Sequence, residues 1–154
     1  MIIVSVSEQM LYHRHKTGVW YAYPVSTASN GVGNLSGSFQ TPLGKHRIAE
    51  KIGDHLPLMT AFRAREPFCI YDPEHDDPKK DWILTRILWL TGCETGKNRR
   101  GKVDTYRRYI YIHGTHEEDK IGSPASHGCI RMKNEDMLEL FEHVAVGEPV
   151  RIEN

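Results

Sequence analysis

The stretch Ile112-His-Gly-Thr115, followed further along by Ser126-His-Gly-Cys-Ile-Arg131, is the most informative part of this sequence. A histidine follows an apolar run in the first segment, and a cysteine follows a histidine and a glycine in the second. A cysteine attacks a carbonyl carbon as its thiolate, and a nearby histidine supplies both a base and a charge partner. The two segments therefore indicate nucleophilic catalysis, although a lone cysteine and histidine also fit a small buried thiol and a satisfied core imidazole.

Gly128 adds a second signal because it stands directly before Cys129. A glycine lets the backbone approach a ligand closely, and consecutive N–H groups at such a position can hold a developing oxyanion. His113 is expected at the end of a strand and His127 in the loop that carries the cysteine. A site built from a rigid scaffold plus a loop is typical of enzymes.

The chain around these segments has the pattern of a mainly β protein. Alternating or β-branched and aromatic residues predict strands, and a stretch rich in glycine, asparagine and serine predicts a loop over 29–38. Strands are expected within 2–6, 9–13, 18–26, 41–48, 82–90, 106–113 and 149–153. A regular strand over 106–113 would place Arg107, Tyr109, Tyr111 and His113 on one face. The polar segments 54–81 and 92–105 are expected to form the walls or lid of a cleft.

One helix is predicted, over 135–145, after the cysteine segment. Its apolar residues recur at the spacing of a single helix face: Met137, Leu138, Leu140, Phe141 and Val144. Asn134 is expected as its N-cap, and Gly147 is placed to end it. With no linker or repeat, we expect a single domain over 1–154.

Composition excludes several classes of protein. The 154 residues carry 20 basic and 20 acidic side chains, which argues against a nucleic-acid partner. No apolar run is long enough for a transmembrane helix, so no membrane partner is expected. Three cysteines are too few for a disulfide scaffold. The first residues do not form a signal peptide, so a cytoplasmic location is expected, or a periplasmic one if a leader has been removed.

The sequence resembles the L,D-transpeptidase catalytic domain family, also called the YkuD type. The resemblance covers the whole chain and is most specific in Ser126-His-Gly-Cys-Ile-Arg131 with the upstream His113-Gly114. The segments Thr41-Pro-Leu-Gly-Lys-His-Arg-Ile48 and Gly147-Glu-Pro-Val-Arg-Ile152 also resemble family segments. The resemblance implies a mixed β-sandwich with one main helix after the nucleophile loop.

The resemblance also implies roles for individual residues. Cys129 would be the nucleophile and His113 the general base, oriented by a backbone carbonyl. Backbone N–H groups around His127, Gly128 and Cys129 would form the oxyanion hole, and Ser126 would shape the loop. Arg131 would order this loop or bind a substrate carboxylate. It is expected, with Gly114 and Tyr111, among the substrate-binding residues.

The implied reaction is acyl transfer on peptidoglycan stem peptides, with tetrapeptide-containing muropeptides as substrates and no cofactor. Cleavage of the L,D bond before the terminal D-alanine would leave a thioester on Cys129. Lack of a signal peptide favours an L,D-carboxypeptidase that produces tripeptide. The alternative is an L,D-transpeptidase that forms 3→3 cross-links or exchanges D-amino acids. Carbapenem-type β-lactams are expected to acylate Cys129.

Other interpretations remain open. His113, His116, His127 and Cys129 provide the donors of a tetrahedral zinc site, although we expect no metal. A module that binds wall fragments without turnover is the alternative outside enzymes. The pair His13-x-His15 is interpreted as solvated.

Overall fold

The computed structural model describes residues 1–154 and contains ten strands, one α-helix and two short 3₁₀ helices. The strands are β1 (Ile2–Ser5), β2 (Met10–Arg14), β3 (Trp20–Ser26), β4 (Gly44–Ile52), β5 (Thr60–Arg63), β6 (Glu66–Ile70), β7 (Ile83–Gly92), β8 (Tyr111–Gly114), β9 (Ile130–Met132) and β10 (Pro149–Glu153). The helices are α1 (Asn134–His143), η1 (Gly101–Val103) and η2 (Glu118–Lys120). The expected mainly β fold with one main helix is confirmed. None of the helices is long and apolar enough to cross a membrane.

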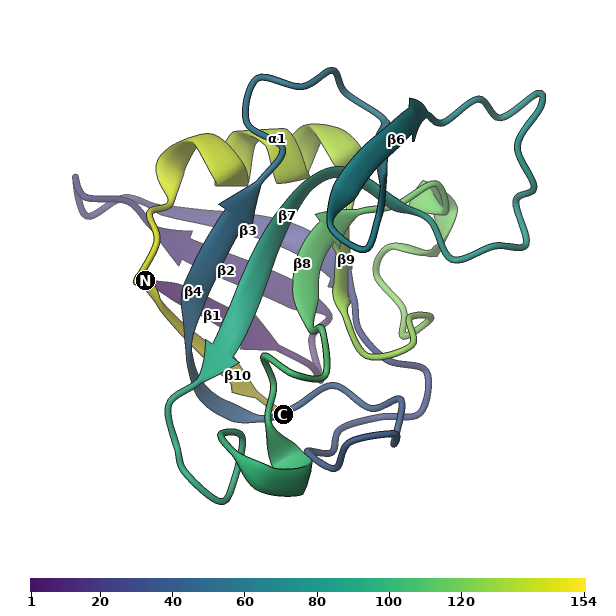
Figure 1. The fold of residues 1–154 in the computed structure, drawn as a ribbon. Coiled ribbons are helices and arrows are strands. Elements are labelled where there is room, and N and C mark those ends of the chain that lie inside the picture. Colours follow the sequence, from purple (N-terminus) through teal and green to yellow (C-terminus); the bar gives the residue numbers. More distant parts are fainter.

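The sheet is continuous and closes on itself. Its strand order is β4-β10-β1-β2-β3-β9-β8-β7, and β7 pairs again with β4, so eight strands form a ring from which the β5–β6 hairpin extends. Most pairs are antiparallel, whereas β1–β10 and β8–β9 are parallel. Figure 1 shows β4 and β7 crossing in front of β1, β2 and β3, with α1 along one edge. The two layers of the expected sandwich are therefore joined into a flattened barrel.

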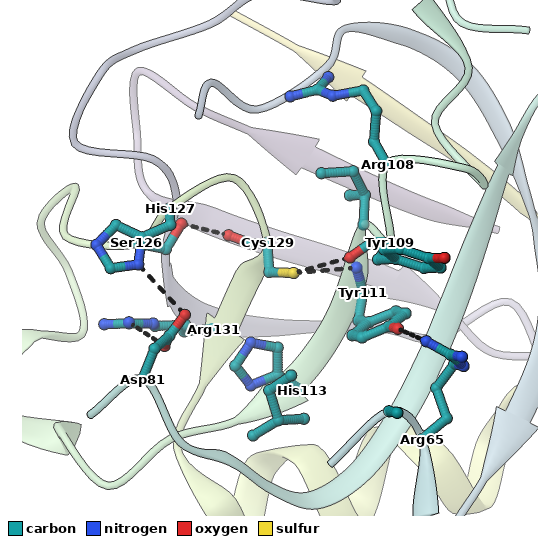
Figure 2. Close-up of a pocket in the computed structure, with 13 residues that line it drawn as sticks. Arg65, Asp81, Arg108, Tyr109, Tyr111, His113, Ser126, His127, Cys129 and Arg131 are labelled. Carbon is teal, nitrogen blue, oxygen red and sulfur yellow. Dashed lines mark hydrogen bonds and ion pairs between the residues drawn. The ribbon is translucent and has the colours of Figure 1, made fainter. Parts of the chain in front are cut away.

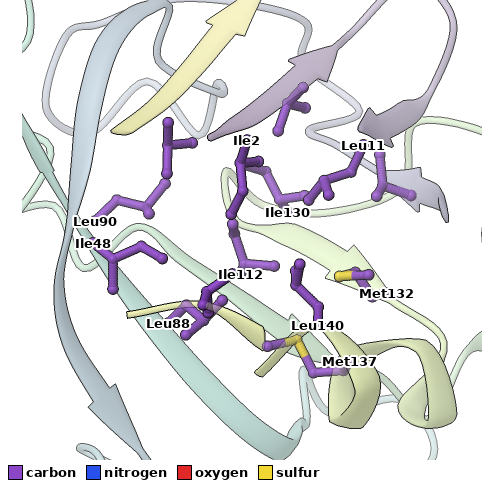
Figure 3. Packing of buried hydrophobic residues seen from close by; sticks show 14 of the residues in the cluster. Ile2, Leu11, Ile48, Leu88, Leu90, Ile112, Ile130, Met132, Met137 and Leu140 are labelled. Atoms are coloured by element: carbon purple, nitrogen blue, oxygen red, sulfur yellow. The ribbon is translucent and has the colours of Figure 1, made fainter. Parts of the chain in front are cut away.

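The space between the layers holds the main hydrophobic core. It consists of 18 buried residues and receives side chains from all eight strands of the ring and from α1. Inward residues such as Ile112 and Ile130 alternate with outward ones, as the period of two in a strand requires. Figure 3 shows Met137 and Leu140 of α1 packing toward the strand residues. Packing of α1 on this core fixes the chain just after the cysteine segment.

Two local predictions need correction. The strand expected over 106–113 begins only at Tyr111, because the preceding residues form a turn in which Tyr109 has a φ of 57°. Arg107 and Tyr109 therefore do not continue the face of His113. Asn134 is the first residue of α1 and does not cap it: its side chain accepts a hydrogen bond from Thr85 and donates one to the Thr115 carbonyl.

The outer face of β7 and β8 carries a second, smaller cluster. Phe62, Ile87, Trp89 and Tyr111 are buried there, and Cys129 packs against them. Phe62 belongs to the β5–β6 hairpin, which lies inside the segment that the sequence predicts as an irregular wall. The hairpin thus packs on the outer face of β7 and β8, the same face on which Cys129 lies.

Candidate active site

Parallel pairing of β8 with β9 brings the two informative segments together. His113 lies opposite Arg131 in the ladder, and both side chains point away from the core. Cys129 directly precedes β9 and lines, with His113, a cavity of about 340 Å³. The other lining residues are Ala64, Arg65, Asp81, Ile83, Arg108, Tyr109, Ile110, Tyr111, Ser126, His127 and Arg131. The cavity therefore combines a thiol, an imidazole and several charged groups (Figure 2).

The Cys129 thiol is held between two backbone groups. The Tyr111 N–H donates to Sγ at 3.3 Å, and the thiol lies 3.4 Å from the Tyr109 carbonyl oxygen, to which it donates. Burial, with a smaller contribution from the Asp81 carboxylate, raises the pKa of the thiol to about 12. The Tyr111 N–H and the Arg131 guanidinium act in the opposite direction. At neutral pH the resting group is a thiol, which needs a base to become a nucleophile.

His113 is arranged to be that base. Its Nδ1 lies 2.6 Å from the Gly114 carbonyl oxygen, so Nδ1 carries the proton and Nε2 keeps a free lone pair. Burial lowers the pKa of the imidazole, although the Asp81 carboxylate and the Gly114 carbonyl partly offset this. A neutral imidazole with a free lone pair is the form that accepts a proton. This geometry agrees with the expectation that a backbone carbonyl orients the His113 ring.

Hydrogen bonds within the loop, and one from a distant segment, hold the loop that carries Cys129. The Ser126 hydroxyl accepts from the Gly128 N–H at 3.2 Å and donates to the Cys129 carbonyl at 2.6 Å. Thr41 donates to the Gly128 carbonyl at 3.0 Å. Gly128 has a φ of 134°, a value that other residues rarely adopt. Ser126 thus holds the ends of the loop together, and Gly128 permits its conformation.

The oxyanion-hole prediction can be narrowed to particular N–H groups. The Gly128 N–H is already used by Ser126, whereas the N–H groups of His127 and Cys129 donate to no acceptor within the protein. Free donors beside a nucleophile are what an oxyanion requires. The pair His127 and Cys129 is therefore the candidate donor set, and this assignment stays a prediction.

Gly114 does not line the cavity, in contrast to its expected contact with substrate. A Cβ atom at this position would lie 2.2 Å from the Asn134 Oδ1 atom and 2.8 Å from the Leu84 carbonyl oxygen. The close approach of α1 to β8 thus requires glycine here. Gly114 acts on the site through its carbonyl, which orients His113.

The guanidinium of Arg131 is occupied by two carboxylates. It lies 2.6 Å from the nearer Asp81 oxygen and 3.1 Å from Glu117, and the side chain is only 3% exposed. Of the two roles expected for Arg131, this geometry favours ordering the loop and leaves no free donor pair for a substrate carboxylate. Sequence reasoning placed Asp81 at the end of the expected 54–81 wall but gave it no role, because it carries no local motif.

Asp81 is the anionic centre of the cavity. Besides Arg131, it accepts from His127 Nδ1 at 3.3 Å. Burial tends to raise its pKa, but attraction by His113 and Arg131 outweighs burial, and the pKa lies below its ordinary value. Asp81 is therefore ionised at neutral pH and favours a positive charge on His113.

Arg65 is a second residue that the sequence analysis missed. It stands at the turn between β5 and β6, where its φ is 67°, and its Nη1 donates to the Tyr111 hydroxyl at 3.2 Å. The guanidinium lies 4.9 Å from the ring centres of both Trp89 and Tyr109. It has no carboxylate partner in the chain. Tyr111 lines the cavity as predicted and links the thiol to this free cation.

Of the expected walls, only part of 54–81 reaches the cavity. Ala64, Arg65 and Asp81 line it, whereas no residue of 92–105 does. The turn before β8 lines the cavity instead, through Arg108, Tyr109 and Ile110. Arg108 of this turn donates to the Gly33 and Gln40 carbonyls and so ties it to a neighbouring loop.

The four donors of the alternative zinc site are not assembled. His116 does not line the cavity, and its Nε2 donates to the Pro78 carbonyl at 2.7 Å. The Nδ1 atoms of His113 and His127 are paired with Gly114 and Asp81, respectively, so only the Nε2 atoms of these rings remain as donors. This donor set therefore does not form a tetrahedral site in the present geometry.

Comparison with known proteins places this geometry in a family. The model of the YkuD L,D-transpeptidase catalytic domain matches residues 1–152. The chain is 27% identical to the probable L,D-transpeptidase YcfS of Escherichia coli over 157 aligned residues, covering 99% of this chain and 43% of that protein. The curated relatives are matched over only 14–43% of their own lengths.

Solved structures share the fold. L,D-transpeptidase 3 from Mycobacterium tuberculosis, in complex with a faropenem-derived adduct, superposes with a TM-score of 0.59 at 18% identity, over 99% of this chain and 59% of that one. LD transpeptidase LdtMt1 in complex with imipenem also gives 0.59 at 18% identity, over 99% and 57%. With the family model matching nearly the whole chain, the resemblance drawn from the motifs is confirmed, and this chain belongs to the L,D-transpeptidase catalytic domain family of YkuD type.

Proposed function

We propose that this protein catalyses cysteine-dependent acyl transfer on peptidoglycan stem peptides and cleaves the L,D bond before a terminal D-alanine. The observation that carries the proposal is that the Cys129 thiol and the His113 imidazole, whose Nδ1 is bound to the Gly114 carbonyl and whose Nε2 is free, line one cavity with the cation of Arg65. Stem peptides bear several carboxylates, which suit such a cavity.

The first half-reaction makes a thioester. His113 Nε2 takes the thiol proton while Sγ attacks the carbonyl carbon, and the N–H groups of His127 and Cys129 hold the oxyanion. The ionised Asp81 stabilises the imidazolium that forms. Collapse of the intermediate breaks the C–N bond, and His113 returns the proton to the departing amino group of D-alanine.

Water or an amine then resolves the thioester. His113 takes a proton from the acceptor, whose oxygen or nitrogen displaces Sγ, and the proton returns to the thiolate. We favour water, which needs no second binding site and releases tripeptide, the L,D-carboxypeptidase reaction. A specific observation favours the transpeptidase as second candidate. A hollow of about 460 Å³ adjoins the cavity through Ala64 and Arg65, and the carboxylates of Glu50 and Glu66 line it, which suits a cationic amine.

A product analysis distinguishes these outcomes. Purified protein is incubated with disaccharide-tetrapeptide, with and without an added D-amino acid, and the products are measured by mass spectrometry. Cysteine-dependent loss of one alanine with little exchange is the expected result. Cross-linked dimers or D-amino-acid exchange as the main product would show that the protein is a transpeptidase and not an L,D-carboxypeptidase. Binding of the muropeptide without any conversion would identify a non-catalytic module.

Within this function, Arg65 is the candidate anchor for a carboxylate of the donor stem. An arginine pairs with a carboxylate through two parallel hydrogen bonds, and hydrogen bonds to charged groups contribute about 1.5–3 kcal/mol. Arg65→Ala is therefore expected to lower kcat/KM for tetrapeptide by about 10- to 100-fold, mostly through KM. The measurement is a substrate titration of both proteins with the tetrapeptide.

A matched control lies on the same hairpin. Arg63 is exposed and its guanidinium packs over Phe68 at 4.4 Å, outside the cavity. Arg63→Ala should leave kcat/KM within about twofold of the wild type, since surface substitutions have small effects. Substrates amidated at one carboxyl group at a time then show which carboxylate Arg65 binds. An Arg65→Ala variant that processes the tetrapeptide as well as Arg63→Ala does would refute the anchor.

A further inference from the structure

Three histidines gather at the end of α1, away from the thiol. His13 on β2 and His15 just beyond it are two residues apart and share one face of the strand. His143 comes from the last turn of α1, which runs from β9 toward the side of the molecule where the N-terminus lies (Figure 1). The interpretation of His13-x-His15 as a solvated pair is wrong, because His13 is 1% exposed and His15 is half-buried.

The rings of these histidines are close together. The ring centres of His13 and His15 lie 4.8 Å apart, and those of His15 and His143 lie 4.4 Å apart. Tyr21 stacks on His15 at 4.0 Å and closes one side of the group. We call His13, His15 and His143 the histidine cluster. It contains no cysteine.

Two nitrogens in the histidine cluster are buried without a hydrogen-bond partner: Nδ1 of His13 and Nε2 of His15. A buried polar atom left unpaired costs free energy, so each one in a folded protein needs an explanation. His13 makes its other hydrogen bond through Nε2, which lies 2.8 Å from the Glu148 carboxylate. With the proton on Nε2, the unpaired Nδ1 carries a lone pair.

We propose that the histidine cluster binds one divalent transition-metal ion of the Zn²⁺ class through the imidazoles of His13, His15 and His143. Neutral imidazoles are the commonest ligands of such ions, and two buried ring nitrogens of the cluster are without a hydrogen-bond partner. The contact from His13 to Glu148 is the arrangement in which a carboxylate orients a metal-bound histidine and raises its basicity.

Metal binding requires the rings to turn, because zinc–nitrogen bonds are about 2.0–2.1 Å long and the three nitrogens must converge on one point. His143 is exposed and free to rotate, so it can complete the site that the two buried rings begin. The ion would link β2 to the end of α1, whose packing places the nucleophile loop. Its role would therefore be structural.

The test is a Zn²⁺ titration of the wild type and three variants, with a chromogenic chelator as competitor. His15→Ala and His143→Ala remove ligands at half-buried and exposed positions and should lower the affinity of this site at least tenfold. The matched control is His75→Ala, because the donor atoms of Asp72, Glu74 and His75 already lie within 4.8 Å of one another and could bind the ion instead, whereas those of the histidine cluster must first move together. His75→Ala should leave the Zn²⁺ affinity of the histidine cluster unchanged.

Two further readouts separate the histidine cluster from the thiols. Zn²⁺ should raise Tm in the wild type and in His75→Ala but not in the two ligand variants, since an ion that binds only the folded state stabilises it. Bound Co²⁺ should show no thiolate charge-transfer band. The proposal is overturned by unchanged Zn²⁺ affinity in both ligand variants, by loss of binding in His75→Ala alone, or by a thiolate band that disappears in Cys129→Ala.

Discussion

Cys129→Ala is expected to abolish turnover of tetrapeptide and leave the fold intact. The thiol is the only nucleophile in the cavity that a neighbouring base can activate, so its loss should lower kcat by about 10³-fold or more. The side chain is small and half-buried, so Tm should change little. The measurements are tripeptide release followed by chromatography and thermal unfolding of both proteins.

The same substitution tests β-lactam acylation. The structures of relatives with imipenem and with a faropenem-derived adduct concern other proteins, and we propose that carbapenems acylate Cys129 here. Intact mass should show one adduct on the wild type and none on Cys129→Ala. Cys93→Ala is the matched control, because Cys93 is a free and exposed cysteine. Turnover that survives Cys129→Ala but not Cys93→Ala would disprove the assigned nucleophile.

His113→Gln is expected to lower kcat by about 10²- to 10⁴-fold at neutral pH, the range that a general base contributes. The amide keeps a polar side chain in the buried position but cannot accept the thiol proton. His116→Gln is the control, since His116 lies outside the cavity. An equal loss in both variants would favour the alternative in which these histidines hold a metal together.

The pH dependence follows from the directions of the two pKa shifts. Burial lowers the pKa of His113 below its ordinary 6.5, so the base is lost only as pH falls below that value. The Cys129 pKa of about 12 means that deprotonation of the thiol adds no second limb near neutral pH. The profile of kcat/KM should therefore be flat above pH 6.5 and fall below it. An acid limb centred above pH 7 would contradict a neutral resting pair.

The parts of the site that depend on short-range chemistry could be predicted from the sequence. Ser126, Gly128 and Cys129 lie within four residues, and the hydrogen bonds that shape their loop are mostly made among themselves. The apolar spacing of α1 likewise encodes a buried face without reference to other elements. Motif and periodicity were therefore sufficient to propose the nucleophile and to predict the mainly β character and the single helix.

The errors arose where a local pattern was overridden by distant contacts. The alternation at 106–113 predicts a strand, but the chain turns there, and β8 begins where pairing with β7 and β9 becomes possible. Position 114 is a glycine because α1 approaches β8 closely there. Nothing in the neighbouring sequence indicates this approach. Asp81 pairs with Arg131 across 50 positions, and Arg65 reaches Tyr111 across 46.

The sequence by itself therefore determined the mainly β scaffold with its single helix, and it was enough to propose a cysteine nucleophile with a histidine base. Only the tertiary structure decided the surroundings of that chemistry, namely the ionised Asp81, the free cation of Arg65, the neutral state of the thiol and the distant histidine cluster. The physical reason is that periodicity and motifs report interactions over a few residues. Burial, charge pairing and pKa shifts depend on which distant segments the closure of β7 onto β4 brings together.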